Sequence, residues 1–144
     1  MAEVSFYVLS SNSIDKRDEF ACKLIEKAYR SECFCYVLTD NDAQSHKINE
    51  LLWTFRASSF VPHQLFDGTV PEFKKIILIG SEPVPTDWQH TVVNLSTNCP
   101  VNFSNIARIL EILDNNESTK IPGRQRYSQY QKAGIPITTH HINN

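Results

Sequence analysis

The sequence is poor in glycine, and its few glycines are not spaced for a phosphate-binding loop. They are Gly68, Gly80, Gly123 and Gly134. None fits the G-x-G-x-x-G or G-x-x-x-x-G-K pattern, in which glycines let the backbone approach a phosphate closely. The segment that follows the first apolar run is SSNS (10–13), with side chains where such a loop needs bare backbone. This absence argues against a dinucleotide-dependent enzyme.

Long hydrophobic runs and regularly spaced cysteines are also missing. No stretch approaches the roughly 20 consecutive apolar residues of a membrane span. The amino terminus, MAEVSFYVLS, lacks the charged-then-apolar plan of a signal peptide. We therefore expect a cytoplasmic protein with no membrane partner. The spacing of Cys22, Cys33, Cys35 and Cys99 matches neither a zinc ribbon nor a disulfide scaffold, so we expect no metal and no cofactor.

Acidic residues are absent from the carboxy-terminal stretch. Beyond Glu117 there is no Asp or Glu, while Lys120, Arg124, Arg126 and Lys132 give this stretch a charge of +4. Residues 1–117 hold ten basic against sixteen acidic side chains. Such a distribution argues against broad binding to duplex DNA, which needs cationic contacts over a wide face. It leaves room for a small anionic partner at one end of the molecule.

Hydrophobic patterning predicts strands that alternate with helices over one domain, residues 1–144. Apolar runs rich in aromatic and β-branched residues predict strands, whereas apolar residues at helical spacing predict helices. The resulting fold class is α/β, with a mostly parallel sheet covered by helices on both faces. The predicted strands are 4–9, 34–38, 73–80, 91–95 and 135–141, and the predicted helices run from the SSNS segment to about 29, from TDND (39–42) to about 55, and over 103–113 and 124–134.

Candidate catalytic residues are few. His63 follows Pro62 and could act as a general base near neutral pH. Its neighbours form no recognisable triad or nucleophile elbow, so a hydrogen-bonded structural histidine is the simpler interpretation. A small nucleotide-dependent or hydrolytic α/β enzyme with His63 as base remains an alternative. His140 and His141 are adjacent and point to opposite faces of a strand, so they do not share one metal.

Trp53 is out of place for a core residue. On a helix, Leu51, Leu52 and Phe55 fall within about 60° of Ile48, whereas Trp53 lies about 140° away. It either packs under the following loop or is displayed to a partner, because tryptophan is a frequent interface anchor. That loop, SSFVPHQLF (58–66), adds Phe60 and the stiff Val61–Pro62 step.

The predicted carboxy-terminal helix combines basic and aromatic side chains. Arg124, Tyr127 and Gln131 share one face, Lys120 lies one turn earlier, and Tyr130 joins them at the edge. A solvated basic helix accounts for the charges but less well for the tyrosines. An arginine and a lysine beside aromatic rings suit a short acidic peptide with a terminal carboxylate. Direct binding of single-stranded DNA would use similar residues and stays an alternative.

Three segments together resemble the chi subunit of bacterial DNA polymerase III. They are FYVL near the start, LLWTFRASSFVPHQL in the middle and RQRYSQYQKAGIPI at the end. The combination of W-x(6)-FVPH with R-x-R-Y-x-x-Y-x-x-AG makes the resemblance specific. It implies a single-domain Rossmann-like fold without nucleotide chemistry. It also implies a non-catalytic accessory subunit of the clamp-loader assembly in DNA replication.

The resemblance further implies two protein partners, with DNA contacted only indirectly. One is the psi subunit of the clamp loader; the other is the acidic carboxy-terminal tail of single-stranded DNA-binding protein. Ser128 stands where some family members have a further lysine, which would weaken tail binding by up to about 1 kcal/mol. The expected psi-binding residues are Trp53, Phe60, Val61, Pro62 and His63, and the expected tail-binding residues are Lys120, Arg124, Tyr127, Tyr130 and Gln131.

Overall fold

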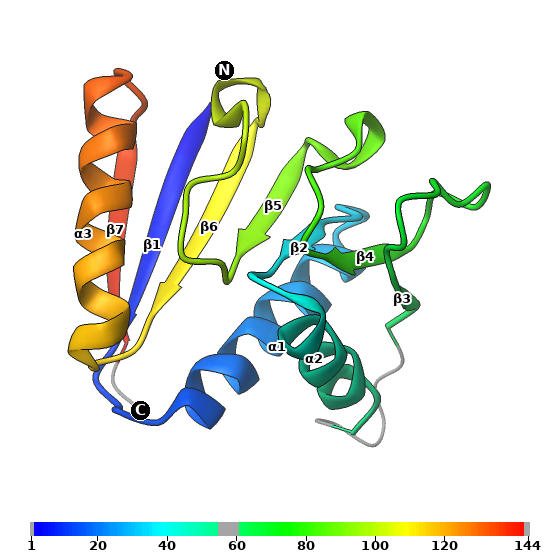
Figure 1. The fold of residues 1–144 in the computed structure, drawn as a ribbon, viewed down its shortest axis with the longest axis horizontal. Helices are drawn as coiled ribbons and strands as arrows, with labels where there is room; N and C mark the ends of the chain where they lie inside the picture. The colour runs from blue at the N-terminus through cyan, green and yellow to red at the C-terminus, as the bar shows by residue number, and fades with distance from the viewer. Residues whose placement is uncertain (1, 55–60, 143–144) are drawn as a thin grey trace.

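A computed structural model describes residues 2–54 and 61–142. It contains seven strands, three α-helices and two short 3-10 helices (Figure 1). In chain order these are β1 (Glu3–Leu9), α1 (Ile14–Arg30), β2 (Tyr36–Leu38), α2 (Asp42–Thr54), β3 (His63–Leu65), β4 (Ile77–Gly80), η1 (Thr86–Trp88), β5 (Thr91–Asn94), η2 (Phe103–Asn105), β6 (Arg108–Leu113), α3 (Glu117–Lys132) and β7 (Ile137–Ile142).

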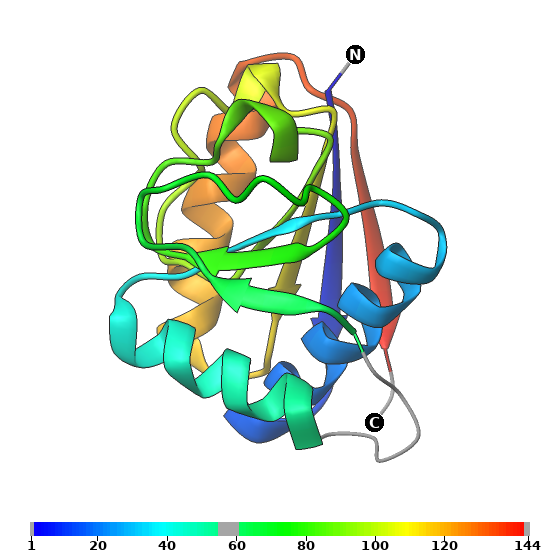
Figure 2. The same ribbon diagram turned by 90° about the vertical axis from the view of Figure 1, so that its right-hand side faces the viewer.

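The strands form one sheet in the order β3-β4-β2-β5-β6-β1-β7. Every strand pair is parallel. The α/β prediction with a mostly parallel sheet is therefore confirmed. Parallel strands require crossover connections, and α1, α2 and α3 supply those from β1 to β2, from β2 to β3 and from β6 to β7. Figures 1 and 2 show α3 on one side of the sheet and α1 on the other.

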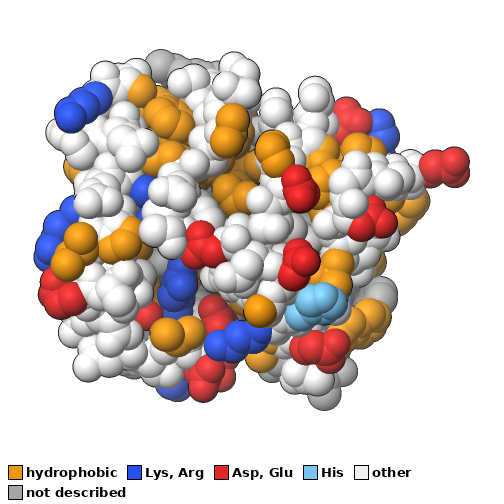
Figure 3. Space-filling model, in the orientation of Figure 1, with side chains coloured by type: hydrophobic (Ala, Val, Ile, Leu, Met, Phe, Trp, Pro, Cys, Tyr) orange, Lys and Arg blue, Asp and Glu red, His pale blue; other side chains and the backbone are white. Residues whose placement is uncertain are grey.

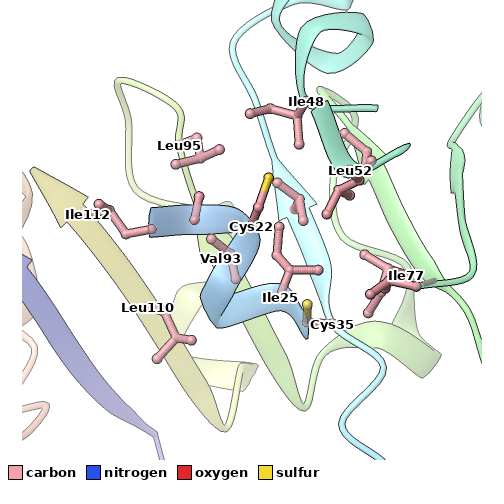
Figure 4. Close-up of a cluster of buried hydrophobic side chains, with 14 of the residues drawn as sticks. Cys22, Ile25, Cys35, Ile48, Leu52, Ile77, Val93, Leu95, Leu110 and Ile112 are labelled. Carbon is pink, nitrogen blue, oxygen red and sulfur yellow. The ribbon is translucent and has the colours of Figure 1, made fainter. Parts of the chain in front are cut away.

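Alternate residues along each strand serve two separate hydrophobic clusters. Val37, for example, faces the cluster under α1 and α2, while its neighbours Tyr36 and Leu38 face the cluster under α3. This alternation follows from the two-residue period of a strand. Figure 4 shows the first cluster, to which α1 and α2 contribute Cys22, Ile25, Ile48 and Leu52 and the strands contribute Ile77, Val93, Leu110 and Ile112. Cys35, directly before β2, also belongs to it.

The prediction of a helix over residues 103–113 is wrong. Residues 103–105 form one short 3-10 turn, and residues 108–113 form β6, which lies between β5 and β1. A strand inside a parallel sheet is buried on both faces, so its sequence (RILEIL) lacks the alternation that marks a half-buried strand. Periodicity alone does not separate such a run from a buried helix.

The last helix begins earlier than predicted, at Glu117 rather than near Arg124. Pro122 and Gly123 lie inside it, although both residues usually interrupt helices. A Cβ atom on Gly123 would lie 2.8 Å from the Leu113 methyl groups, so glycine lets α3 pack closely on β6. Gly134 follows the helix with φ of +74°, the left-handed conformation common after helix ends.

Candidate protein-binding surfaces

Trp53 lies near the end of α2 and is 52% exposed. The helix buries Ile48 and Leu52 against the sheet, which turns Trp53 away from the core. Its indole ring contacts the imidazole of His63, with the ring centroids 4.8 Å apart. The prediction that Trp53 lies off the core face of its helix is confirmed. Phe60, the other aromatic residue of the expected psi-binding set, lies outside the described residues.

Three further residues of the expected psi-binding set lie next to Trp53 or beneath it. Pro62 is half-buried, whereas Val61 and His63 are only 2% and 8% exposed. The expectation that Val61 and His63 offer binding surface is therefore corrected: both side chains are enclosed by the protein itself. They support the surface from below, because His63 carries the Trp53 ring on one side.

His63 is held as a structural histidine. Its Nδ1 lies 2.6 Å from the carbonyl oxygen of Val61, and its Nε2 lies 3.1 Å from that of Asn49. Both ring nitrogens thus face backbone carbonyls, which joins β3 to α2. Among the described residues, no serine, cysteine or carboxylate shares these contacts, so no nucleophile is paired with the imidazole there.

The outer face of α3 carries the residues expected to bind an acidic tail. Arg124, Tyr127 and Gln131 are exposed there, and Lys120 is half-buried. The Arg124 guanidinium lies 3.9 Å from the Glu117 carboxylate, with both side chains more than two-thirds exposed. Tyr127 is 38% exposed and rests on Phe6 of β1, with centroids 5.4 Å apart. Figure 3 shows most of the blue side chains of this view in its left half, over and beside α3.

Tyr130 does not belong to that surface. It is fully buried in the cluster beneath α3, so its expected place in the tail-binding set is a wrong prediction. Arg126 is likewise 3% exposed and paired with a carboxylate. The basic stretch predicted from the sequence therefore presents one charge fewer to solvent than its composition indicates.

Both residues bind Glu111, a fully buried carboxylate on β6. Arg126 Nε donates to Glu111 Oε1 at 3.0 Å. Tyr130 Oη and Asn94 Nδ2 donate to Oε2 at 2.6 and 3.0 Å. The Arg126 Nη1 group also donates to the Thr97 carbonyl at 2.8 Å. Sequence reasoning missed this network, because its partners are far apart in the chain and Glu111 was assigned to a helix.

Burial and charge act in opposite directions on the network. Burial raises the pKa of Glu111, while the Arg126 charge and the hydrogen bonds from Tyr130, Asn94 and Arg126 lower it. Burial and the neighbouring Glu111 carboxylate both raise the pKa of Tyr130. The hydroxyl group therefore stays protonated and donates its hydrogen bond to Glu111. The satisfied network fixes α3 against β5 and β6, and so orients the outer face of that helix.

The chain matches a known family over nearly its whole length. The sequence model of the family described as "DNA polymerase III chi subunit, HolC" covers residues 1–138. The chain belongs to the chi subunit family. This confirms the resemblance carried by the FYVL, W-x(6)-FVPH and R-x-R-Y segments.

Three chi subunits are similar to this chain along their full length. The one from Pseudomonas aeruginosa is 28% identical, covering 99% of this chain and 98% of the relative. The chi subunit of Haemophilus influenzae is 24% identical, with 95% of each chain covered. That of Escherichia coli is 23% identical, covering 96% of this chain and 97% of the relative.

A solved structure, that of T4 UvsW, shares the fold. It has a TM-score of 0.70 and 12% identity, and the match covers 99% of this chain and 42% of UvsW. At that identity the likeness concerns architecture alone.

Membership of the chi family agrees with the expectation of an accessory polymerase subunit in place of a catalytic chain. Within the described part of this chi-family protein, no helix has the length and apolar character to span a membrane, and no His, Cys, Asp and Glu residues gather as a metal site.

Proposed function

We propose that this chi-family chain acts as one domain in the bacterial cytoplasm and joins the clamp loader to single-stranded DNA-binding protein. Its partners are the psi subunit, at the surface around Trp53, and the acidic carboxy-terminal tail of the single-stranded DNA-binding protein, at the outer face of α3. DNA is reached through that second protein. The observation that carries the proposal is the outer face of α3, where an exposed arginine and an exposed tyrosine lie on a helix fixed by a buried network.

The electrostatics of Arg124 favour an acidic peptide. The Arg124–Glu117 pair is long and exposed, so it contributes little free energy and is readily exchanged for another carboxylate. A peptide carboxylate can bind the guanidinium through two parallel hydrogen bonds, which are stronger and more directional. Lys120 lies one turn before Arg124 and adds a second positive charge.

Tyr127 gives the same surface an apolar component. Its ring is anchored on Phe6, so little conformational entropy is lost when a ligand packs on it. The exposed part of the ring suits an apolar residue at the end of an acidic tail. Ser128, half-buried on the same helix, lacks the charge of the lysine found in some family members, and we expect tail affinity to be lower by up to about 1 kcal/mol for that reason.

A peptide titration tests the tail site. A fluorescent acidic peptide that ends in an apolar residue with a free carboxylate is titrated with the wild type and with Arg124→Ala. Loss of a charge-assisted bond predicts roughly tenfold weaker binding or more. Arg30→Ala is the matched control, because Arg30 is equally exposed and paired with a glutamate, but lies on α1. Equal affinity of Arg124→Ala and wild type would remove this assignment.

A second titration tests the psi surface. Trp53→Ala is expected to weaken psi binding by about 2 kcal/mol or more, the usual effect of truncating a tryptophan anchor. Changing Phe60 to a charged residue should disrupt the same interaction. Phe73→Ala is the control, since Phe73 is 61% exposed in the loop between β3 and β4. If psi binds the Trp53 and Phe73 variants equally well, the surface has been misplaced.

The direct binding of single-stranded DNA is less well supported than the adaptor. Such binding uses several aromatic rings on which successive bases stack. Because Tyr130 is buried, Tyr127 is the one tyrosine of α3 whose ring is exposed for stacking. Salt-sensitive binding of an oligonucleotide by the isolated protein would favour this alternative.

A further inference from the structure

A small polar crevice lies at the carboxyl ends of β5 and β6. It is a cavity of about 90 Å³ between the first turns of α1, α2 and α3. Figure 1 shows the arrowheads of β1 and β6 and the beginnings of α1 and α3 at the same end of the molecule. The residues that matter for its chemistry are Arg17, Arg126, Ser96, Thr97, Ser118 and Thr119.

Two arginines line this crevice, and both are fixed by backbone carbonyls. Arg17 donates Nε to Ile112 O at 3.1 Å and Nη2 to Leu95 O at 3.2 Å. Arg126 donates Nη1 to Thr97 O, two residues further along the same loop, besides its bond to Glu111. Each guanidinium has five N–H groups. Among the described residues, three N–H groups of each guanidinium make no further hydrogen bond.

The positive charges of the two guanidinium groups repel each other. Burial lowers the pKa of Arg17, and the Arg126 charge lowers it further, while Asp18, Asp114 and Glu111 raise it. Among the described residues, Glu111 is the one carboxylate that forms an ion pair with Arg126. A dianion between the two arginines would relieve this repulsion and would replace water with charge-assisted hydrogen bonds.

The position in the fold is also favourable. The crossover from β1 passes through α1 on one face of the sheet, and the crossover from β6 passes through α3 on the other. Ligands of open α/β sheets bind at such a reversal, beyond the carboxyl ends of the strands. The first turn of α3 adds the hydroxyl groups of Ser118 and Thr119 and the positive end of a helix dipole.

We propose that this crevice binds a phosphate group, either free or as a monoester, between Arg17 and Arg126. The site is distinct from the outer face of α3, because Arg124 and Arg126 are two positions apart and point about 160° away from each other. One carboxylate, Asp40, also lines the crevice, but both of its oxygens accept hydrogen bonds from Thr97. It thereby holds the loop that supplies the Arg126 contact.

A neighbouring cavity favours an organic monoester over the free ion. It measures about 200 Å³ and shares Asp40 and Ser96 with the phosphate crevice. Leu38, Val84 and Val101 supply apolar lining. An apolar or ring-shaped group attached to the phosphate would fill this space, and we therefore expect a monoester to bind more tightly than inorganic phosphate.

Titration by NMR tests the proposal on the full chain. The side-chain Nε–H signals of the arginines are followed as inorganic phosphate is added, and then adenosine monophosphate, against sodium chloride at matched ionic strength. Saturable shifts of the Arg17 and Arg126 signals with phosphate, but not with chloride, are expected. A lower dissociation constant for the monophosphate would identify the ligand as an ester; equal values would identify it as the free ion.

Four variants decide the location. Arg17→Gln should weaken binding roughly tenfold or more, and Ser118→Asp should do the same by placing a negative charge at the mouth. Ser118→Asp also covers the case in which Arg17→Gln fails to fold, since carboxylates are favourable in a first helical turn. Lys16→Gln removes an exposed charge from the same turn of α1 and should leave affinity unchanged. Shifts that never saturate, or binding lost with Arg124→Gln but kept with Ser118→Asp, would overturn the proposal.

Discussion

The buried ion pair beneath α3 should dominate the stability of that helix. Replacing Glu111 by glutamine leaves Arg126, which is 3% exposed, without its counter-charge. Breaking a buried pair by removing one partner costs about 3–5 kcal/mol. Glutamine keeps one carbonyl acceptor for Tyr130 or Asn94, so we expect the lower end of this range, about 3 kcal/mol.

Urea unfolding followed by far-UV circular dichroism measures this loss. The matched control is Glu117→Gln, which breaks the second arginine–glutamate pair of α3. That pair is 3.9 Å long with side chains 68% and 69% exposed, so its loss should stay within about 0.5 kcal/mol. The double variant Glu111→Leu/Arg126→Met removes the unpaired charge and should recover part of the lost stability. The recovery stays incomplete, because the buried Tyr130 hydroxyl loses its acceptor. Equal unfolding free energies for Glu111→Gln and Glu117→Gln would refute the reasoning.

Three further predictions concern the core. Cys22 and Cys35 are fully buried, whereas Cys33 is partly exposed, so iodoacetamide should label Cys33 in the native protein and the other two only after unfolding, as peptide mass spectrometry would show. Burial raises the pKa of both Cys22 and Cys35 from 9.0 to about 12. As the pH rises, the thiols therefore ionise first in the unfolded chain. The free energy of unfolding should fall by about 1.4 kcal/mol per pH unit for each thiol between these two pKa values. In chemical denaturation at alkaline pH, the free energy of unfolding of a Cys22→Ala/Cys35→Ala variant should fall less steeply with pH. Gly80→Ala would place a Cβ 2.6 Å from the Tyr36 hydroxyl oxygen and should lower the free energy of unfolding by about 1–3 kcal/mol, as thermal melts would show. Gly68→Ala is the comparison in the same melts. Its Cβ would meet nothing within 4 Å, but its φ is +98°, so it tests backbone strain alone.

The sequence predicted the parts of the fold that depend on local patterns. Strands 4–9, 91–95 and 135–141 correspond to β1, β5 and β7, and the first two helices lie where their apolar spacing places them. The errors arose where tertiary packing overrides local preference. The sequence of β6 resembles that of a buried helix because both faces of the strand are buried. Gly123 lies inside α3 because the close contact with Leu113 favours a residue without a side chain.

The candidate surfaces were predictable to a similar extent. The exposure of Trp53 follows from its angle on α2, which depends only on helix geometry. The burial of Tyr130 does not follow from α3 alone. It depends on Glu111, whose place in the sheet is set by pairing with β1 and β5, and no local pattern carries that information.

The two proposed surfaces lie on helices that cover opposite faces of one sheet. α2 packs through Ile48 and Leu52 on one face, and α3 packs through Tyr130 on the other. Partners bound to these helices would therefore share no contact residues and would not compete for space at either site. Two modest contacts on one rigid body raise the effective concentration of each partner near the other, without any conformational change in the chain. A rigid sheet is suited to this task, because a flexible connection would lower that concentration.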